Sequence, residues 1–552
     1  MAPAAPWESA YPPGLAADAE IATFPVHDLP DRAAARWPDR PAFDFRGRKI
    51  GYAAFAAAAN AAAARLADLG VGPGDRVALL LPNTPWHPVA FFGALKAGAT
   101  VVHLSPLDAP RIQTHKLVDS GAKLLVTTNF GKLATLAAAV ARQCGIEGLV
   151  VGDDAHWGEG PETGAIPKGG DVAVWREPGE AAIDGSQIGE DMLAVLQYTG
   201  GTTGLPKAAM LTHANLSAAL SSYELWYRGW DLADEQPDRI LLYLPLFHIY
   251  GLVTVMLRSL NAGSEILLRS RFDPHEALDD IEAGATVFPG VPTMWIAISS
   301  VPGFEKRDLS SLRLAASGGA PLPVEVASRF QRRTGIELVG GWGMSETSPA
   351  GTGLPRSRSD KAGSIGVPLP GVFLRVVSLT DPAREMPVGE TGELAVRGKN
   401  VTAGYLNRPD ENAHCFVDGW FLTGDIGYMD EDGFFFIVDR RKDMIISGGF
   451  NVYPQMIEQA IYEHEDVEEV LVIGVADTYR GEAAKAFVKL RDGAAPLTLE
   501  TLRAFLKNRI GPHEMPAALE VRDALPRTPV GKLSKLELKQ EEAARSDAAK
   551  AS

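Results

Sequence analysis

Ten consecutive residues, Tyr198-Thr199-Gly200-Gly201-Thr202-Thr203-Gly204-Leu205-Pro206-Lys207, combine three glycines, three threonines and a lysine. Upstream, the apolar run Met192–Leu196 predicts a buried strand, and downstream Thr212–Asn215 predicts the start of a helix through Trp226. A glycine-rich loop between a strand and a helix lets free backbone N–H groups converge on anionic oxygens. We therefore predict a phosphate-binding loop whose candidate ligand contacts are Thr199, Gly200, Gly201, Thr202, Thr203, Gly204 and Lys207.

This loop is not a Walker A loop, which requires Gly-x-x-x-x-Gly-Lys-Ser/Thr. Here two residues separate Gly204 from Lys207, and Ala208 follows the lysine. For the loop taken alone, a glycine-rich surface turn is the less favoured alternative, because such turns are common.

Other segments rich in glycine, hydroxyl groups and charge accompany this loop. They are Pro245–Gly251, Gly290–Trp295, Gly318–Leu322, Gly340–Thr347, Trp420–Asp425, Asp439–Asp443, Ser447–Pro454 and Pro529–Lys532. Their order and spacing over nearly the whole chain resemble the acyl-adenylate-forming superfamily of acyl-CoA ligases, adenylation domains and beetle luciferases. That family usually has a small hydroxyl residue at the position of Gly200, although fatty-acyl ligases often share the glycine.

The resemblance implies an ATP site. Trp342 stands where the family usually has Tyr or Phe and keeps an aromatic face for stacking on adenine. Ser345 stands at a usual Thr and keeps a hydroxyl for the α-phosphate. A carboxylate at Asp425 suits the two ribose hydroxyls, which are both donors, and Arg440 resembles the second ribose contact. The implied contacts outside the phosphate-binding loop are Gly319, Ala320, Pro321, Gly340, Gly341, Trp342, Gly343, Ser345, Asp425 and Arg440.

The same resemblance implies the catalytic residues Lys532, Glu346 and Ser345. Glu346 and Thr199 supply hard oxygen ligands for Mg²⁺. The alternative for Glu346 taken alone is a solvated carboxylate. Lys532 matches the catalytic lysine of the family and lies on a glycine turn. The family often has Arg at Lys535, so a secondary contact to CoA or phosphate is in doubt there.

Two further segments are implied to move. The charged run Asp439–Asp443 contains the position of the family's hinge, Lys442, and a solvated charged turn is the alternative. Gly448 and Gly449 match the loop that shapes the pantetheine tunnel for CoA, and a plain helix-entry turn is the alternative.

The implied acid pocket comprises His248, Tyr250, Val291, Met294 and Met344, with His248 in substrate binding rather than as a base. The identity of the acid stays open. The Thr-Gly-Gly loop and the opening Trp7–Gly14 favour a medium- or long-chain fatty acid. Leu107–Gln113 and Leu252 depart from the long-chain pattern, so aromatic and dicarboxylic acids remain alternatives.

Composition narrows the class of protein. The chain has 552 residues, a net charge of −16 and only two cysteines, Cys144 and Cys415. We expect several domains, no nucleic-acid partner, no disulfide scaffold and a reducing, cytoplasmic compartment. The sequence shows no signal peptide and no apolar stretch long enough to cross a membrane. Peripheral membrane contact and the choice between monomer and homodimer stay open.

Alternating strands and helices predict an α/β fold with parallel sheets. We expect a large domain over 1–439, made of two α/β-layered subdomains and a small β-rich subdomain near Gly363–Gly433. We expect helices throughout Ala33–Leu69, a hinge at 440–442, a mobile α+β domain over 443–540 and a disordered tail over 541–552. This fold would position the motifs around one nucleotide site.

The resemblance implies an AMP-forming acid–CoA ligase that uses ATP, Mg²⁺ and CoA. The acid attacks the α-phosphorus of ATP, giving acyl-AMP and diphosphate, and the CoA thiol then displaces AMP. Three alternatives remain: an enzyme that loads a carrier protein, a luciferase-like oxidoreductase and a non-catalytic nucleotide-binding regulator. An α/β hydrolase is disfavoured, because the chain contains no Gly-x-Ser-x-Gly.

Overall fold

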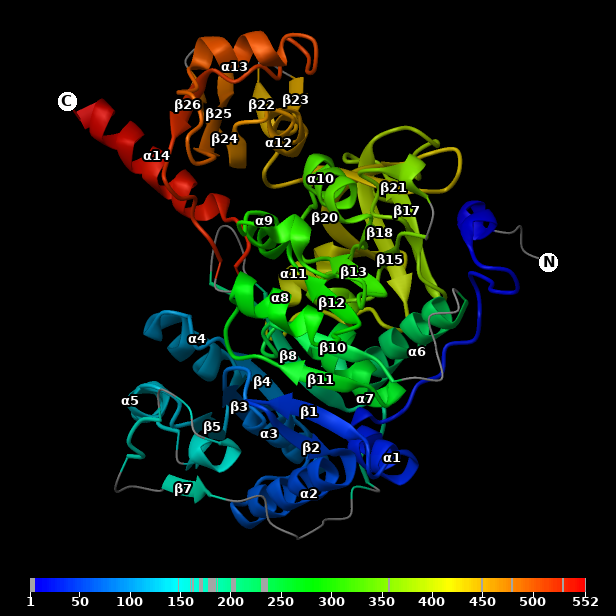
Figure 1. Cartoon of the computed structure of the whole chain (residues 1–552), viewed down its shortest axis with the longest axis vertical. Helices are drawn as coiled ribbons and strands as arrows, with labels where there is room; N and C mark the ends of the chain where they lie inside the picture. Colours follow the sequence, from blue (N-terminus) through cyan, green and yellow to red (C-terminus); the bar gives the residue numbers. More distant parts are fainter. Residues whose placement is uncertain are drawn as a thin grey trace.

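The structure, a computed structural model, describes residues 5–146, 148–158, 160, 163–167, 172–176, 185, 187–199, 205–229, 237–355, 358–447, 450–477, 480–528 and 531–551. Figure 1 shows two α/β layers, a β-rich region beside the second layer, and a smaller domain in orange and red at one end. This arrangement confirms the predicted fold class. None of the described helices has the length and apolar character of a membrane span.

The first layer is a seven-stranded sheet in the order β7-β6-β5-β3-β4-β8-β9. Its strands are parallel except β9, which runs antiparallel to β8. Such strands are buried on both faces, and β4 and β5 are buried along their whole length. The strands are β3 (Arg76–Leu80), β4 (Thr100–Leu104), β5 (Leu124–Thr128), β6 (Gly148–Gly152), β7 (Val172–Trp175), β8 (Leu193–Thr199) and β9 (Lys207–Thr212). The neighbouring helices are α2 (Tyr52–Asp68), α3 (Trp86–Lys96), α4 (Pro110–Ser120) and α5 (Leu133–Cys144), with the short η3 (Asp154–Trp157).

The second layer is a seven-stranded sheet in the order β14-β13-β12-β10-β11-β1-β2. The strands are β1 (Pro41–Phe45), β2 (Arg48–Gly51), β10 (Arg239–Leu242), β11 (Glu265–Leu268), β12 (Val287–Gly290), β13 (Leu314–Ser317) and β14 (Leu338–Gly340). The associated helices are α1 (Leu29–Arg36), α6 (His213–Gly229), η4 (Tyr250–Leu257), α7 (Arg258–Ala262), α8 (Pro274–Glu282), α9 (Pro292–Ser299) and α10 (Val324–Thr334), with the short η1 (Pro6–Ala10), η2 (Val26–Asp28), η5 (Phe304–Lys306) and η6 (Ser345–Thr347). Residues 249–262 continue from η4 into α7 without a break, and η4 is a π-helix.

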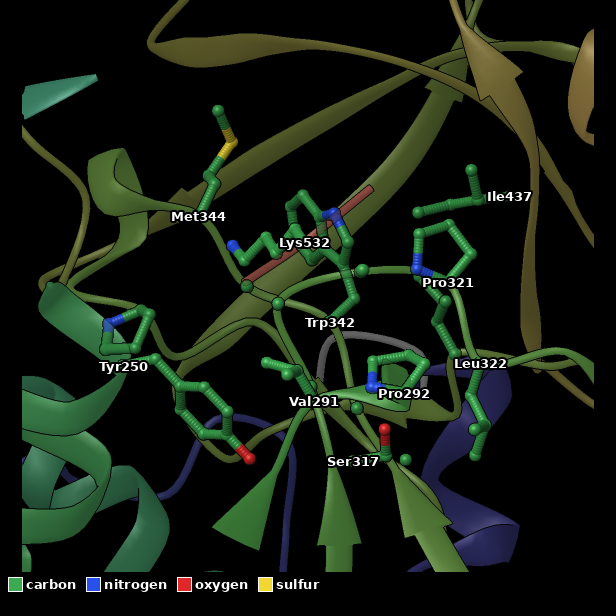
Figure 2. Close-up of a pocket in the computed structure, with 18 of the residues that line it drawn as sticks. Tyr250, Val291, Pro292, Ser317, Pro321, Leu322, Trp342, Met344, Ile437 and Lys532 are labelled. Atoms are coloured by element: carbon green, nitrogen blue, oxygen red, sulfur yellow. The ribbon is translucent and has the colours of Figure 1, made fainter. Parts of the chain in front are cut away.

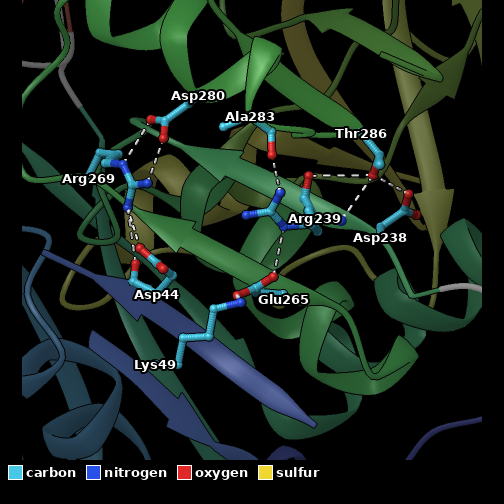
Figure 3. Close-up of polar contacts among 9 residues, drawn as sticks. All are labelled: Asp44, Lys49, Asp238, Arg239, Glu265, Arg269, Asp280, Ala283 and Thr286. Atoms are coloured by element: carbon cyan, nitrogen blue, oxygen red, sulfur yellow. Dashed lines mark hydrogen bonds and ion pairs between the residues drawn. The ribbon is translucent and has the colours of Figure 1, made fainter. Parts of the chain in front are cut away.

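The expectation of helices throughout Ala33–Leu69 is wrong, because the β1–β2 hairpin separates α1 from α2. The hairpin lies in the second layer, where β1 pairs in parallel with β11. Ion pairs reinforce this junction (Figure 3): Arg269 bonds both Asp44, at 3.1 Å, and Asp280, at 2.7 Å. Lys49 and Arg239 both bond Glu265 at 2.9 Å. Pairing with a distant strand therefore overrides the helical propensity of the flanking alanines.

The phosphate-binding loop does not run directly into a helix as expected. Lys207 opens β9, which returns antiparallel along β8 before α6 begins at His213. The predicted start of the helix is confirmed: Thr212 N donates to Asn215 Oδ1 at 3.0 Å, and Asn215 N donates to Thr212 Oγ1 at 3.1 Å. These reciprocal bonds satisfy N–H groups at the start of the helix.

The β-rich region is an antiparallel five-stranded sheet with a small two-stranded sheet beside it. Its elements are η7 (Ser359–Lys361), β15 (Thr352–Gly353), β16 (Val367–Pro368), β17 (Val372–Val377), β18 (Gly392–Gly398), α11 (Pro409–Cys415), β19 (Phe416–Val417), β20 (Trp420–Met429) and β21 (Phe435–Arg440).

The C-terminal domain, called the lid below, follows the end of β21. Its elements are β22 (Ile445–Ser447), β23 (Phe450–Val452), α12 (Pro454–Tyr462), β24 (Val467–Asp477), β25 (Gly481–Leu490), α13 (Leu499–Leu506), β26 (Ala518–Val521) and α14 (Lys535–Ala551). The expected disordered tail over 541–552 is wrong as far as Ala551, because α14 continues to that residue. Its Ala, Glu and Lys residues are strong helix formers, and Arg545 pairs with Glu542 at 2.7 Å.

Candidate active site

A cavity of about 1310 Å³ lies between the large domain and the lid. It collects residues from both layers, the β-rich region and the lid. The sequence-predicted residues that line it are Thr199, Lys207, His248, Tyr250, Val291, Gly319, Ala320, Pro321, Gly340, Gly341, Trp342, Gly343, Met344, Ser345, Glu346, Asp425, Arg440, Lys442 and Lys532. Gly200, Gly201, Thr202, Thr203, Gly204, Gly448 and Gly449 lie outside the described residues.

Met294 is not among the residues that line the cavity, and its place in the acid pocket stays a prediction. It lies on α9, whose Thr293 and Ile296 do line the cavity, whereas Met294 is buried in the hydrophobic core. The 3.6-residue period of the helix turns neighbouring side chains to different faces.

Trp342, Asp425 and Arg440 form one hydrogen-bonded group at the predicted ribose position. The Trp342 indole N–H donates to Asp425 Oδ2 at 2.8 Å, and Arg440 Nε lies 2.6 Å from Asp425 Oδ1. Asp425 and Arg440 are cross-strand partners on β20 and β21. Because both oxygens of this buried carboxylate have donors, its orientation is fixed before any ligand binds. The indole N–H adds a role for Trp342 besides the predicted stacking.

Glu346 is buried, with 4% of its surface exposed, and lies on the short helix η6. Tyr405 donates its hydroxyl to Glu346 Oε1 at 2.7 Å. Burial, and secondly the charge of Glu346, raise the pKa of Tyr405, which keeps that proton in place. Lys207 lies 3.8 Å from the centre of the Tyr405 ring and 2.6 Å from Glu411. No sequence signal marked Tyr405.

Among the described residues, Glu346 belongs to no group of three or more acidic, histidine or cysteine side chains. Over the described ranges, three or more such side chains nowhere form a group that could hold a metal ion. Thr199 also lines the cavity, so one carboxylate and one hydroxyl are present. Mg²⁺ is often held by one or two carboxylates together with the phosphates of a substrate, and this sparse donor set fits that mode.

Lys532 enters the cavity from the lid, just before α14. Figure 2 shows its amine above Tyr250 and beside Trp342. Gly319 admits it: a Cβ there would lie 2.9 Å from Lys532 Cε and 3.0 Å from Nζ, and Gly319 has a φ of +75°. Burial, with the charge of Arg440 as the second cause, lowers the pKa of Lys532 to about 8.

The lid is held in this position by hydrogen bonds to the large domain. Thr293 Oγ1 donates to the Gly531 carbonyl at 3.0 Å, beside Lys532. Gln455 N on α12 donates to Asp439 Oδ2 at 2.8 Å. The structure thus captures the lid with its lysine inside the site.

His248 is neutral in this site. Burial lowers its pKa well below the usual range, and the positive charge of Lys532 lowers it further. Its Nδ1 accepts from Tyr250 N at 3.2 Å, so the ring proton resides on Nε2. A neutral imidazole with one N–H suits hydrogen bonding to a carboxylate better than proton abstraction, in agreement with the predicted binding role.

One end of the cavity, where the sequence predicts the acid pocket, is aromatic. Tyr223, Trp226 and Tyr227 line it from α6, at helix spacings that place them on one face, opposite Tyr250 of η4. A Cβ at Gly318 would lie 3.1 Å from the Tyr250 hydroxyl oxygen. The three aromatic residues of α6 were missed, although their i, i+3, i+4 spacing was visible in the sequence.

Comparison with known proteins gives consistent matches. The family described as AMP-binding enzyme matches residues 30–406, and the AMP-binding enzyme C-terminal domain matches residues 456–532. A long-chain-fatty-acid–CoA ligase of Bacillus subtilis (strain 168) is 37% identical, covering 97% of this chain and 98% of its own. A feruloyl-CoA synthase of Amycolatopsis sp. is 38% identical, covering 93% and 98%. The crystal structure of ATP-bound MatB from Rhodopseudomonas palustris is 30% identical, with a TM-score of 0.81 over 93% of this chain and 98% of that chain.

Proposed function

The chain belongs to the AMP-binding enzyme family, and from this membership we propose that it is an AMP-forming acid–CoA ligase for medium- or long-chain fatty acids. ATP and CoA are its co-substrates. The long-chain-fatty-acid–CoA ligase relative supports the choice of acid. The observation that carries the proposal is Lys532: its amine lies in one cavity with the Trp342–Asp425–Arg440 group and with an aromatic acid pocket.

In the first step, a carboxylate oxygen of the acid attacks the α-phosphorus of ATP, and the bond to the bridging oxygen of diphosphate breaks. The chemistry needs charge stabilisation rather than a general base. Lys532 supplies a cation at the phosphate, Ser345 a hydroxyl, and Asp425 with Arg440 fixes the ribose. His248 donates a hydrogen bond from Nε2–H to the acid carboxylate and orients it.

Glu346 and Thr199 would hold Mg²⁺ together with the phosphates of ATP. The ion would neutralise charge on the phosphate oxygens. Tyr405 orients the Glu346 carboxylate through its 2.7 Å hydrogen bond and leaves Oε2 for the ion.

In the second step, the CoA thiol attacks the acyl carbon and AMP leaves. We assign Lys442, exposed at the cavity rim between β21 and β22, as the pivot about which the lid rotates. Rotation would withdraw Lys532 and bring Gly448 and Gly449 to the CoA tunnel. The division at 440–442, a cytoplasmic location and a monomeric or homodimeric state remain predictions from the sequence.

The test measures diphosphate release and acyl-CoA formation with ATP and a panel of fatty and aromatic acids. CoA and an acyl-carrier protein are supplied in parallel as acceptors. We expect diphosphate release with fatty acids and product on CoA. Diphosphate release without acyl-CoA, but with acylated carrier protein, would replace the ligase assignment by a carrier-loading one.

A further inference from the structure

The far end of the acid pocket is polar, which a plain fatty acid does not require. Tyr223, Tyr227, Tyr250 and Thr254 line it with hydroxyl groups. Ser317 adds another: its Oγ is buried, with 4% of the residue exposed, and has no hydrogen-bond partner among the described residues. Figure 2 shows Ser317 and the Tyr250 hydroxyl on the same side of the pocket, away from Lys532.

A guanidinium group stands directly behind this end. Arg258, the first residue of α7, lines a small cavity of about 10 Å³. Tyr227 and Leu314 line both this small cavity and the main one. The guanidinium carbon of Arg258 lies 4.2 Å from the centre of the Tyr227 ring, so that ring separates Arg258 from the acid pocket.

Arg258 keeps unused donors. Its Nε donates to the Thr254 carbonyl at 3.2 Å. In the described part of the chain, its two terminal nitrogens have no hydrogen-bond acceptor and no carboxylate partner. A half-buried guanidinium without a counter-ion among the described residues is unusual, because charged groups away from bulk water are normally paired.

Among the described residues, the carboxylates on the elements next to Arg258 already have partners. Glu224 of α6 bonds Arg228 at 2.5 Å and Asn261 at 2.6 Å. Asp238, which lines the small cavity with Arg258, bonds Arg313 at 2.5 Å and Thr286 at 2.7 Å.

We propose that this pocket selects an α,ω-dicarboxylic acid, with one carboxylate near Lys532 and His248 and the other bound by Arg258 and the tyrosine hydroxyls. A guanidinium fork matches a carboxylate in shape and charge. A fatty acid that ends in a methyl group would give Arg258 no partner. An acid that ends in a phenol would hydrogen-bond a tyrosine hydroxyl but leave the guanidinium charge uncompensated. Binding in this way requires the Tyr227 ring, which lines both cavities, to turn aside. The inference rests on the proposed ligase function.

The test compares kcat/KM for diphosphate release with decanedioic and decanoic acids, and with dodecanedioic and dodecanoic acids as a second pair. Arg258→Met removes the charge at similar size, and Arg258→Lys keeps it. Arg332→Met is the matched control, because that guanidinium lies on the surface of α10 with 62% of its side chain exposed.

We expect the wild type to favour the diacid of each pair. Arg258→Met should lower kcat/KM for the diacids by about tenfold to hundredfold, as expected for lost charge-assisted hydrogen bonds. Activity on the monoacids should be kept or increased, which also shows that the variant folds. The kcat/KM of Arg258→Lys for the diacids should lie between those of the wild type and Arg258→Met. Arg332→Met should match the wild type.

Three results would overturn the inference. They are a wild-type preference for the monoacids, an unchanged diacid-to-monoacid ratio in Arg258→Met, and a preference for ferulic acid over every diacid. Each of these leaves the ligase function standing. Absence of diphosphate release with all acids would instead overturn the proposed function, and this inference with it.

Discussion

Gly319 is the position at which one added methyl group tests the placement of Lys532. Its φ of +75° lies in the left-handed region, and a Cβ would approach Lys532 Cε to 2.9 Å and Nζ to 3.0 Å. The neighbouring atoms are the far end of a flexible side chain, so the amine rather than the backbone yields. Gly319→Ala should therefore displace the amine from the place that we propose for it beside the α-phosphate.

The size of the effect has two parts. An L-residue in the left-handed region costs about 1–2 kcal/mol of stability. Losing one preorganised contact to the charge that develops in a transition state costs about 10²–10³ in rate. A displaced amine keeps part of that contact, so we expect diphosphate release to slow by about tenfold to hundredfold.

The variant Gly335→Ala separates the stability cost from the loss of rate. The φ of Gly335 is also +75°, but nothing lies within 4 Å of its added Cβ. Gly335→Ala should lower the melting temperature as Gly319→Ala does and leave diphosphate release near the wild-type rate. Acyl-CoA formation from supplied acyl-AMP should be spared in both variants, because we place Lys532 outside the site in that step. Equal diphosphate release by the two variants would refute the close placement of Lys532.

Four further outcomes are expected. Glu346→Gln should raise the Mg²⁺ concentration for half-maximal diphosphate release by at least about tenfold, because losing even a residue that only supports a metal ligand weakens metal binding by about tenfold or more. An unchanged Mg²⁺ titration would contradict the assignment of Glu346 as a ligand. Lys442→Pro should leave adenylation near the wild-type rate and slow CoA transfer, because proline fixes φ near about −65°; intact transfer in a folded variant would exclude this pivot. Because the pKa of Lys532 is lowered to about 8 and its charged form is required, kcat/KM for ATP should fall as pH rises through about 8. Lys532→Arg should remove that decline, since arginine stays charged, and a decline that persists would assign it to another group. Trp342→Phe should raise KM for ATP by about tenfold, because buried Asp425 loses a donor; a loss confined to acid binding would contradict this.

The parts of the fold that follow local rules were predictable from the sequence. The strand predicted from the apolar run Met192–Leu196 occurs as β8, because a strand buried on both faces of a sheet needs such a run. β1 and β2 were missed, because their partner strand is distant and the alanines around them favour helix. The continuation of α14 through 541–551 depends on helix formers in a segment that we expected from its composition to be disordered.

The candidate site was predictable where a motif carried it. Trp342, Glu346, Asp425 and Lys532 were named from short segments and all line one cavity. Tyr405 has no such motif, because its contact with Glu346 joins elements 59 positions apart. Long-range contacts of this kind are fixed by packing rather than by local pattern.

The pairing of β1 with β11 sets an order of events during synthesis. Arg269 meets Asp44 across 225 positions of the chain. At about 5–20 residues per second, a ribosome leaves β1 without its partner strand for roughly 11–45 s. Through that interval the first hairpin carries an unsatisfied strand edge, which is a template for pairing with another nascent chain. Folding yield in a cell therefore depends on whether chaperones reach this hairpin before a neighbouring polypeptide does.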